Sequence, residues 1–245
     1  MKIKEIEYWT LKLFIDENRK KMKIILSLSG GIDSGTMIGY YLSKGHQVIP
    51  VNFIYGSKHN QYEQKCAVKL CEHYNIPMGL PSINLGFIGD LFKSDLLKSG
   101  GPISEKHSQT ENMKSTIVPG RNLIFASILA GYAESTGADA IALGVHSGDY
   151  QIYPDCRPKF INSLKETINK SSDGKIDVLA PFLNLDKTWI LKIGYGLPEK
   201  FRTPYKLTRT CYSDQEDSCG ICMVCKERLE AFKDIGKTDP IKYHT

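Results

Sequence analysis

Short apolar runs alternate along the chain with longer stretches of mixed polarity. The run KIILSL at residues 23–28 is almost continuously apolar and leads into Ser-Gly-Gly, a pattern typical of a buried strand that enters a turn. Similar runs predict further strands at residues 48–55, 138–144 and 177–181. Strands that are apolar on both faces are typical of a parallel sheet covered on both sides.

The stretches between these runs show the spacing of helices. Helices are predicted over residues 34–43, 61–75, 121–136, 159–170 and 185–194. Gly45 and Pro77 end the first two, and the polar, Gly-, Ser- and Lys-rich segment 100–116 predicts a mobile loop. Strands that alternate with such helices indicate an α/β fold, with a doubly wound, mostly parallel sheet between two helical layers.

Composition narrows the class of protein. The 245 residues are 41% hydrophobic and 24% charged, as in ordinary globular proteins, and no apolar run approaches the ~20 residues that span a bilayer. Residues 1–14 lack the features of a secretory signal, and the seven cysteines form an odd set. We therefore expect a reducing, cytoplasmic location without a disulfide framework and without a membrane.

The chain divides into three predicted parts. An extension at 1–21 precedes an α/β domain at 22–200, and a small helical region at 201–245 packs on that domain. The extension is either an amphipathic helix or untranslated sequence ahead of Met22.

The charge distribution argues against nucleic acid as a partner. The net charge is +5, but residues 1–23 hold seven Lys/Arg and four Asp/Glu, a surplus of three that leaves +2 for the rest. A nucleic-acid interface needs a clustered basic face, and no long basic run follows residue 23. We expect no stable nucleic-acid binding.

The turn after the first predicted strand carries SGGIDS at residues 29–34. Two adjacent glycines let backbone N–H groups converge on one anion, and the following helix adds its positive N-terminal end. Asp33 requires a cation inside such an anion site, and Mg²⁺ that bridges this carboxylate to a phosphate meets that need. The spacing differs from that of the Walker loop, and a turn that merely caps a helix is the alternative for the motif taken alone.

Four of the seven cysteines lie within 15 residues of one another: Cys211, Cys219, Cys222 and Cys225. Four thiolates at short spacing suit tetrahedral Zn²⁺, and a full set leaves no position for water, so we expect a structural zinc. An iron–sulfur cluster and a set of buried free thiols are the alternatives.

Two further stretches combine polar and aromatic residues. The segment VPGRN at 118–122 opens a predicted helix with Arg and Asn, which suit anion or amide recognition. The segment GVHSGDYQIYPDCR at 144–157 follows a predicted strand, at the edge where open α/β sheets bind ligands. Its carboxylates can accept from a purine edge, and its rings can stack on a heterocycle. A helix cap and a salt-bridged surface turn are the respective alternatives.

These motifs resemble known families. SGGIDS resembles the loop of the ATP pyrophosphatase (PP-loop) superfamily, whose members bind ATP and cleave it between the α- and β-phosphates. The ordered set over about residues 22–235 resembles the 7-cyano-7-deazaguanine synthases of QueC type. The motifs that complete this set are His59 with Gln61, LDKT at 185–188, TCY at 210–212, CGxCxxC at 219–225 and Arg228.

The resemblance implies a PP-loop, Rossmann-like fold and an ATP-dependent ligase. Such an enzyme converts 7-carboxy-7-deazaguanine and ammonia to 7-cyano-7-deazaguanine through adenylated intermediates and an amide, in queuosine or deazapurine biosynthesis. It further implies Mg²⁺ with ATP, one structural Zn²⁺ and a homodimer. No Cys or Ser stands out as a glutaminase nucleophile, which favours free ammonia as the nitrogen source.

The resemblance also assigns roles to residues. Asp33 and Arg121 are expected to be catalytic, and the four clustered cysteines to bind metal. The predicted ATP-binding set is Leu28, Ser29, Gly30, Gly31, Ile32, Asp33, Ser34, Gly35, Thr36, Met37 and Ile38. The predicted substrate-binding set is Asn122, Asp149, Tyr150, Tyr153, Asp155 and Arg157.

The chain departs from the usual pattern of that family at three places: the extension, Ser213-Asp214 and His146-Ser147-Gly148. One alternative is a related enzyme that adenylates the deazapurine carboxylate and transfers it to another acceptor. A PP-loop enzyme that modifies RNA is a second, although it would need a reactive cysteine near the nucleotide and a basic surface. A zinc-ribbon interaction module is a third.

Overall fold

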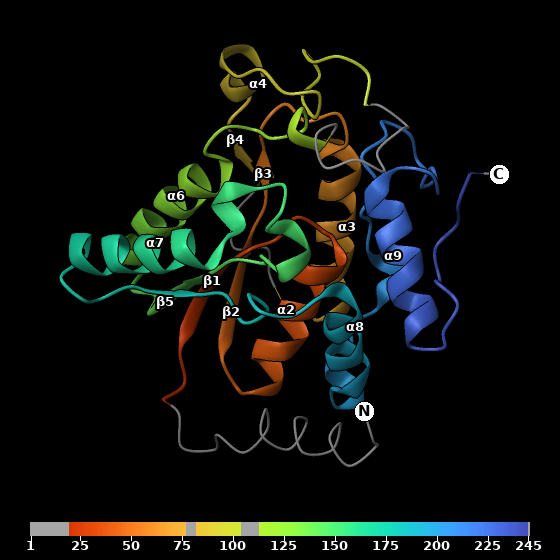
Figure 1. The fold of residues 1–245 in the computed structure, drawn as a ribbon. Coiled ribbons are helices and arrows are strands. Elements are labelled where there is room, and N and C mark those ends of the chain that lie inside the picture. The colour runs from red at the N-terminus through yellow and green to blue at the C-terminus, as the bar shows by residue number, and fades with distance from the viewer. Residues whose placement is uncertain (1–19, 77–81, 104–112, 245) are drawn as a thin grey trace.

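The computed structural model describes residues 20–76, 82–103 and 113–244 (Figure 1). Nearly all of the predicted extension at 1–21 lies outside these residues. The middle of the predicted mobile segment at 100–116 lies outside them as well. In the described ranges, no helix is both long enough and apolar enough to cross a membrane.

A four-stranded parallel sheet forms the centre of the molecule, with strand order β2-β1-β5-β6. Its strands are β1 (Lys23–Ser27), β2 (Gln47–Val51), β5 (Ala140–Ala142) and β6 (Asp177–Leu179). A second parallel pair joins β3 (Phe53–Ile54) to β4 (Ile83–Asn84). Every strand pair in both sheets is parallel, as the sequence predicts.

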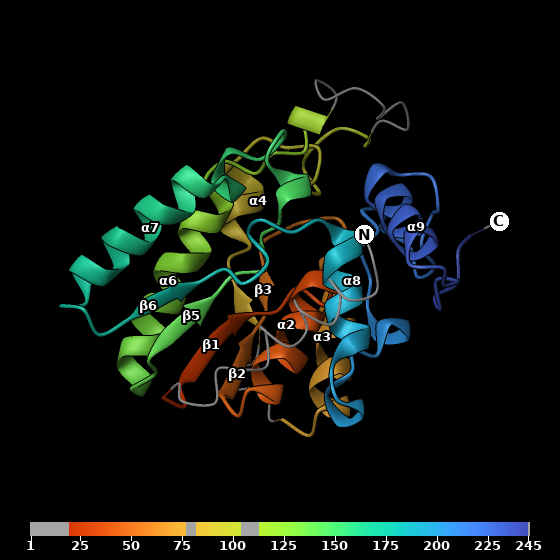
Figure 2. The same ribbon diagram turned by 60° about the horizontal axis from the view of Figure 1, so that its bottom comes forward.

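Helices cover both faces of this sheet (Figures 1 and 2). The helices are α2 (Ile32–Ser43), α3 (Asn60–His73), α4 (Phe87–Leu91), α6 (Arg121–Thr136), α7 (Pro158–Ser171), α8 (Lys187–Gly196) and α9 (Met223–Asp234). Successive side chains of a strand point to opposite faces. Ile25 therefore joins the core on the α6 and α7 side, whereas Ile24 and Leu26 join the core on the α2 and α8 side.

The order of the strands creates the place for a site. The chain leaves β1 through α2 to reach β2 on one side, and later returns through α6 to β5 on the other side. The loops that follow β1 and β5 consequently leave adjacent strands in different directions. In open α/β sheets such a switch point is where ligands bind.

The predicted helices form, and the helix at 121–136 has the predicted bounds. Gly137, with φ of +63°, ends that helix because glycine readily adopts the left-handed conformation. The prediction of a single strand at 48–55 is wrong in one detail. The strand breaks at Asn52, whose Nδ2 donates to the Leu28 carbonyl at 2.7 Å and whose Oδ1 accepts from Ser82.

The C-terminal segment packs on the α/β layers rather than standing apart. Tyr205 and Phe232 belong to the same core as α2 and α8. Arg228 of α9 is fully buried and pairs with Asp239 at 2.6 Å, which holds the last residues against α9. The exact boundary at residue 200 stays a prediction. Four short 3₁₀ turns complete the described fold: Ser147–Asp149, Pro154–Cys156, Glu199–Phe201 and Tyr205–Leu207.

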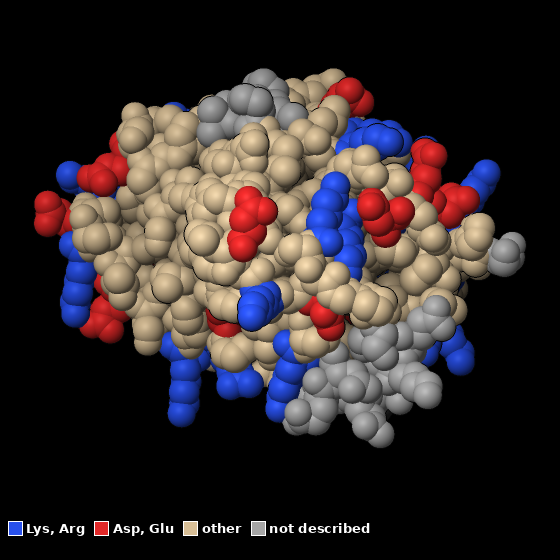
Figure 3. All heavy atoms as spheres, turned by 90° about the horizontal axis from the view of Figure 1, so that it is seen from above, with Lys and Arg blue, Asp and Glu red and all other residues tan. Residues whose placement is uncertain are grey.

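Charges of both signs are interspersed on the face seen from above (Figure 3). Lys and Arg side chains there stand beside Asp and Glu side chains and do not form a single basic patch.

Candidate functional site

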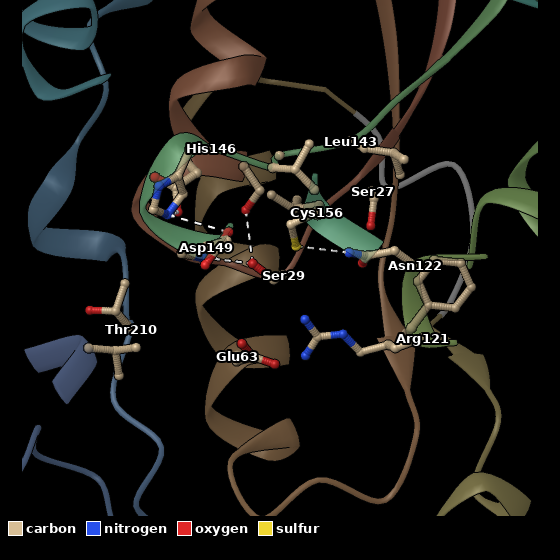
Figure 4. Close-up of a pocket in the computed structure, with 18 of the residues that line it drawn as sticks. Ser27, Ser29, Glu63, Arg121, Asn122, Leu143, His146, Asp149, Cys156 and Thr210 are labelled. Carbon is tan, nitrogen blue, oxygen red and sulfur yellow. Dashed lines mark hydrogen bonds and ion pairs between the residues drawn. The ribbon is translucent and has the colours of Figure 1, made fainter. Parts of the chain in front are cut away.

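A cavity opens at the carboxyl ends of β1 and β5 (Figure 4). Its wall combines the loop after β1, the loop after β5, the first turns of α3 and α6, and a C-terminal strip at 209–212. Segments from almost the entire chain thus meet at the switch point of the sheet. The cavity has two ends: the SGGIDS loop forms one, and Arg121 lies at the other.

The SGGIDS loop forms the first end and depends on glycine. Gly30 has φ of +86°, and a Cβ atom there would lie 2.5 Å from the Glu63 carbonyl oxygen on α3. Gly31 is the N-cap residue of α2 and has no side chain with which to cap that helix. The hydroxyl oxygens of Ser29 and Ser34 lie 3.1 Å apart beside this helix start. Hydroxyls and an uncapped helix N-terminus suit an anion such as pyrophosphate.

Asp33 lies in a network of charges at the same end. Its Oδ2 is 3.3 Å from Lys187 Nζ and 3.9 Å from His146 Nε2, and Lys187 Nζ is also 3.3 Å from Glu227 Oε2. Burial would raise the pKa of Asp33, but the Lys187 ammonium and His146 outweigh burial and hold that pKa below its ordinary value. Asp33 is therefore a carboxylate at neutral pH.

The second oxygen of Asp33 is free among the described residues. Oδ1 is buried and has no hydrogen-bond partner in the described part of the chain. A buried carboxylate oxygen without a partner costs free energy, and a hard cation is a fitting partner for it. The site thus fits the Mg²⁺ expected with ATP.

Lys187 reaches this network because α8 begins there. Asp186 caps the helix, its Oδ1 accepting from the Trp189 N–H at 2.9 Å, and Lys187 is the first helical residue. Despite burial, Asp33 and Glu227 raise the pKa of Lys187, so the ammonium stays charged. Sequence analysis did not select Lys187, although it lies within the LDKT motif.

The other end of the cavity is built around Arg121 and Glu63. Arg121 starts α6, and in Figure 4 its guanidinium extends toward the Glu63 carboxyl group on α3. The Arg121 Cζ atom lies 6.0 Å from the ring centre of Tyr55 and 5.9 Å from that of Tyr153. Burial raises the pKa of Glu63 to about 8, against the opposing effect of Arg121 and Arg209. Glu63 is a further residue that sequence analysis did not select.

The predicted ATP-binding residues divide into two groups. Leu28, Ser29, Gly31, Asp33 and Ser34 line the cavity. Ile32, Thr36, Met37 and Ile38 are fully buried in the core. Gly35 approaches Leu70 and Thr208, and Gly30 lies against α3.

The predicted substrate residues divide in a similar way. Asn122 and Asp149 line the cavity. The other four, Tyr150, Tyr153, Asp155 and Arg157, are not among the described residues that line it. Asp155 instead supports the start of α6, where its Oδ2 accepts from the Asn122 N–H at 3.0 Å.

The remaining three residues brace the loop and the wall. Tyr150 donates to the Leu183 carbonyl, and Arg157 Nε donates to the Tyr150 carbonyl at 2.8 Å. The Tyr153 hydroxyl bonds Tyr212 at 3.1 Å beneath Arg121.

The four clustered cysteines converge as predicted. The sulfur atoms of Cys211, Cys219, Cys222 and Cys225 all lie within 4.8 Å of one another. Backbone N–H groups of Ser213 and Cys219 donate to the Cys211 sulfur at 3.4 and 3.3 Å. None of the seven cysteines forms a disulfide in the structure. The cluster could hold a metal ion.

Arg209 joins this cluster to the nucleotide loop. Its backbone N–H donates to the Gly30 carbonyl at 2.9 Å. Its guanidinium donates to the carbonyls of Ser213, Gln215 and Glu216, which lie in the loop between the first two cysteines of the cluster. Sequence analysis missed Arg209, which directly precedes the TCY motif.

Comparison with known proteins identifies the family. Residues 23–236 match the family model described as "Queuosine biosynthesis protein QueC". This chain belongs to the QueC family. A 7-cyano-7-deazaguanine synthase of Desulfotalea psychrophila is 44% identical over 219 residues, which cover 89% of this chain and 97% of that protein. A protein of the same name from Caldicellulosiruptor saccharolyticus is 39% identical over 91% of this chain and 96% of its own length.

Solved structures support the fold. NMN synthetase from Francisella tularensis aligns with a TM-score of 0.52 and 16% identity, over 97% of this chain and 88% of that chain. The U34-tRNA thiolase NcsA from Methanococcus maripaludis, solved with its [4Fe-4S] cluster, aligns with a TM-score of 0.50 and 18% identity, over 95% and 74%. The predicted α/β fold, the family and an enzyme of queuosine biosynthesis are thereby confirmed.

Proposed function

We propose that this chain converts 7-carboxy-7-deazaguanine, ATP and ammonia to 7-cyano-7-deazaguanine. The observation that carries this proposal is one cavity with two chemically different ends. The SGGIDS loop, Asp33 and Lys187 suit a nucleotide at one end, and Arg121 with Asn122 suits a flat anionic substrate at the other.

The reaction requires activation of an unreactive carboxylate. Attack of the substrate carboxylate on the α-phosphate of ATP forms an acyl adenylate and releases pyrophosphate. Ammonia then displaces AMP and leaves an amide. A second ATP adenylates the amide oxygen, and loss of AMP gives the nitrile. Two ATP are consumed for each nitrile.

At the nucleotide end, the groups of the SGGIDS loop would stabilise the leaving pyrophosphate. The hydroxyls of Ser29 and Ser34 and the N–H groups at the start of α2 point to that role. Asp33 would hold Mg²⁺, which neutralises phosphate charge, and Lys187 keeps Asp33 ionised. Arg121 would neutralise a phosphate or the substrate carboxylate.

We assign two residues to direct contact with the deazapurine, because both line the cavity: Asn122 at the Arg121 end, and Asp149, which lies beside His146 nearer the SGGIDS loop. Asp155 would act through Asn122, whose backbone it binds. Tyr150, Tyr153 and Arg157 would fix the loop and the wall around the heterocycle.

We further propose that the cysteine cluster holds one structural Zn²⁺. Four thiolates complete a tetrahedral shell, and the N–H groups that donate to Cys211 would stabilise its negative charge. Metal analysis of the purified protein, read together with its visible absorption, separates zinc from an iron–sulfur cluster.

A homodimer and a cytoplasmic location complete the proposal. Phe87 and Leu91 on α4 are 53% and 70% exposed, and apolar side chains of this size favour association. The seven free thiols suit a reducing compartment. Sedimentation velocity tests the dimer.

Mass spectrometry of a reaction with 7-carboxy-7-deazaguanine, ATP, Mg²⁺ and ammonium tests the activity. Nitrile together with AMP is the expected result. AMP with the reaction stopped at the amide or the adenylate would indicate transfer to another acceptor, and absence of nucleotide turnover would contradict the proposal.

A further inference from the structure

Glu63 is a carboxyl group in the cavity to which the proposed steps give no role. It lies in the first turn of α3, and its side chain is 17% exposed and lines the cavity. Figure 4 shows its carboxyl group and the Arg121 guanidinium extending toward one another, below Ser29.

The backbone of Glu63 is held against the nucleotide loop. The Glu63 N–H donates to the His59 carbonyl at 3.1 Å, and the Glu63 carbonyl packs so closely on Gly30 that no Cβ would fit between them. The backbone from which the carboxyl group extends into the cavity therefore has a fixed place relative to the SGGIDS loop. Such a fixed position is what proton transfer to a reacting atom requires.

Titratable and charged groups from four other segments face Glu63: Tyr55, His59, Arg121 and Arg209. Cys66 faces it from the next turn of α3 itself. Among these groups, His59 makes a close contact, with its Nε2 3.5 Å from Glu63 Oε1. Burial lowers the pKa of His59 to about 3, so this imidazole is neutral and does not fix Glu63 as a carboxylate. Burial also raises the pKa of Glu63 to about 8, which lets it exchange a proton near neutral pH.

The proposed reaction releases protons from nitrogen at each stage after the first adenylation. When ammonia attacks the acyl adenylate, a C–N bond forms, the C–O bond to AMP breaks and one N–H proton leaves. When ATP adenylates the amide oxygen, a second N–H proton leaves. When the C–O bond to AMP breaks again, the last N–H proton leaves as the nitrile forms.

We propose that Glu63 accepts these protons from the reacting nitrogen and passes them to solvent between steps. This assignment rests on the proposed function. Each of the other cavity carboxylates already has a basic side chain as its neighbour: Asp33 and Glu227 each lie 3.3 Å from Lys187 Nζ, and Asp149 lies 3.6 Å from His146 Nε2. Glu63 stands beyond them, beside the guanidinium that would hold the substrate carboxylate.

The test uses the amide form of the deazapurine as substrate, because the titration of ammonia then cannot contribute to the pH profile. Glu63→Gln keeps the shape of the side chain and removes the proton acceptor. We expect the rate of nitrile formation to fall at least ~100-fold, while the KM for the amide changes less than about threefold. Glu63→Asp should restore part of the rate.

The pH profile gives a second readout. The base must be deprotonated to act, so the wild-type kcat on the amide should rise with pH through about 8, near the pKa of Glu63. This rise should be absent in Glu63→Gln. Glu166→Gln is the matched control, since Glu166 is an exposed residue of α7 that pairs with Lys170. It should keep the wild-type rate and profile.

Three results would overturn the assignment. The first is a wild-type rate and pH profile in Glu63→Gln, and the second is a loss confined to KM, which would make Glu63 a recognition residue. The third result applies if thermal melts show that Glu63→Gln is unstable. In that case the assignment is overturned if kcat on the amide does not change with pH in the wild-type protein and Glu63→Asp has the same profile. Failure of the proposed function itself looks different, because the wild-type protein would then form no nitrile at all.

Discussion

The two ends of the cavity are built in different ways. The nucleotide end rests on six consecutive residues, SGGIDS, in which backbone conformation and close packing leave no choice at Gly30. The other end is assembled from α3, α6 and the C-terminal strip, which are far apart in the sequence. The chemistry of a site formed by consecutive residues can be predicted from the sequence. The chemistry of a site assembled from distant segments can be predicted only when the fold is known.

The largest expected effect comes from Gly30→Ala. The new Cβ would meet the Glu63 carbonyl at 2.5 Å and would also force a non-glycine residue into φ of +86°. We expect AMP formation to fall at least ~100-fold, because the loop would lose the geometry that binds pyrophosphate. The measurement is AMP release with the carboxylate substrate.

Gly174→Ala is the control that separates the effect of backbone strain at positive φ from the effect of the steric clash with Glu63. Gly174 has φ of +77° in a surface turn, and no atom of the described residues lies within 4 Å of an added Cβ. This variant should lose about 1 kcal/mol of unfolding free energy and keep its activity. Full activity in Gly30→Ala would contradict the account of the nucleotide end.

Lys187→Met should have the next largest effect. Without the ammonium the pKa of Asp33 rises, because burial is then opposed only by His146 and local hydrogen bonds. We expect AMP formation to fall about 100-fold at neutral pH. The loss should grow as the pH is lowered, since a protonated Asp33 no longer holds the cation.

The control for that experiment is Lys192→Met on the same helix, where the ammonium lies 4.3 Å over the Trp189 ring and not at the cavity. A pH-independent loss in Lys187→Met would show that Lys187 does not act through Asp33.

Cys225→Ser tests how the C-terminal region supports the nucleotide end. Loss of a ligand should release the metal and loosen the loop whose carbonyls bind Arg209, which in turn binds the Gly30 carbonyl. We expect metal content to fall, the melting temperature to drop and AMP formation to decrease about 10-fold. The control is Cys71→Ser, because Cys71 is a buried free cysteine on α3 outside the cluster. This variant should keep the metal content of the wild-type protein. Full metal retention in Cys225→Ser would contradict a four-cysteine site.

Asp155→Ala should have the smallest effect, and it tests whether Asp155 supports α6 or contacts the substrate at the second end. Asp155 caps α6 through the Asn122 N–H, so its removal should cost about 1 kcal/mol of unfolding free energy. Asp155→Asn should restore most of this stability, because Asn caps helices as well as Asp does. If Asp155 contacts the deazapurine directly, Asp155→Asn would instead raise KM for that substrate while the stability is kept.

The features that could be predicted from the sequence are those formed by consecutive residues, as at the nucleotide end of the cavity. The helix at 121–136 is predictable to the residue, because it has an apolar body and a terminal glycine. The SGGIDS loop and the cysteine cluster are predictable because each lies in one short segment. The break at Asn52 is not, since the bond from its side chain to Leu28 exists only when β1 and β2 are paired.

Residues of the second end were harder to select for a physical reason. Tyr150 and Arg157 look like ligands in the sequence, but in the fold they satisfy backbone carbonyls of their own loop and of a neighbouring one. Glu63 looks like one of many charged residues on an amphipathic helix, and only the packing of α3 on Gly30 brings it into the cavity. Whether a polar residue lines the cavity or pairs with its own loop depends on the packing around it, and a sequence pattern does not show that packing.

The ratio of AMP to nitrile tests the central claim most directly, namely that one cavity activates the same carbon twice. Wild-type protein with 7-carboxy-7-deazaguanine, ammonium, Mg²⁺ and excess ATP is sampled through the reaction, with AMP and all deazapurine species measured together. The account predicts two AMP for every nitrile, with the amide appearing and then disappearing. One AMP for each substrate consumed, with the amide as the final product, would contradict it.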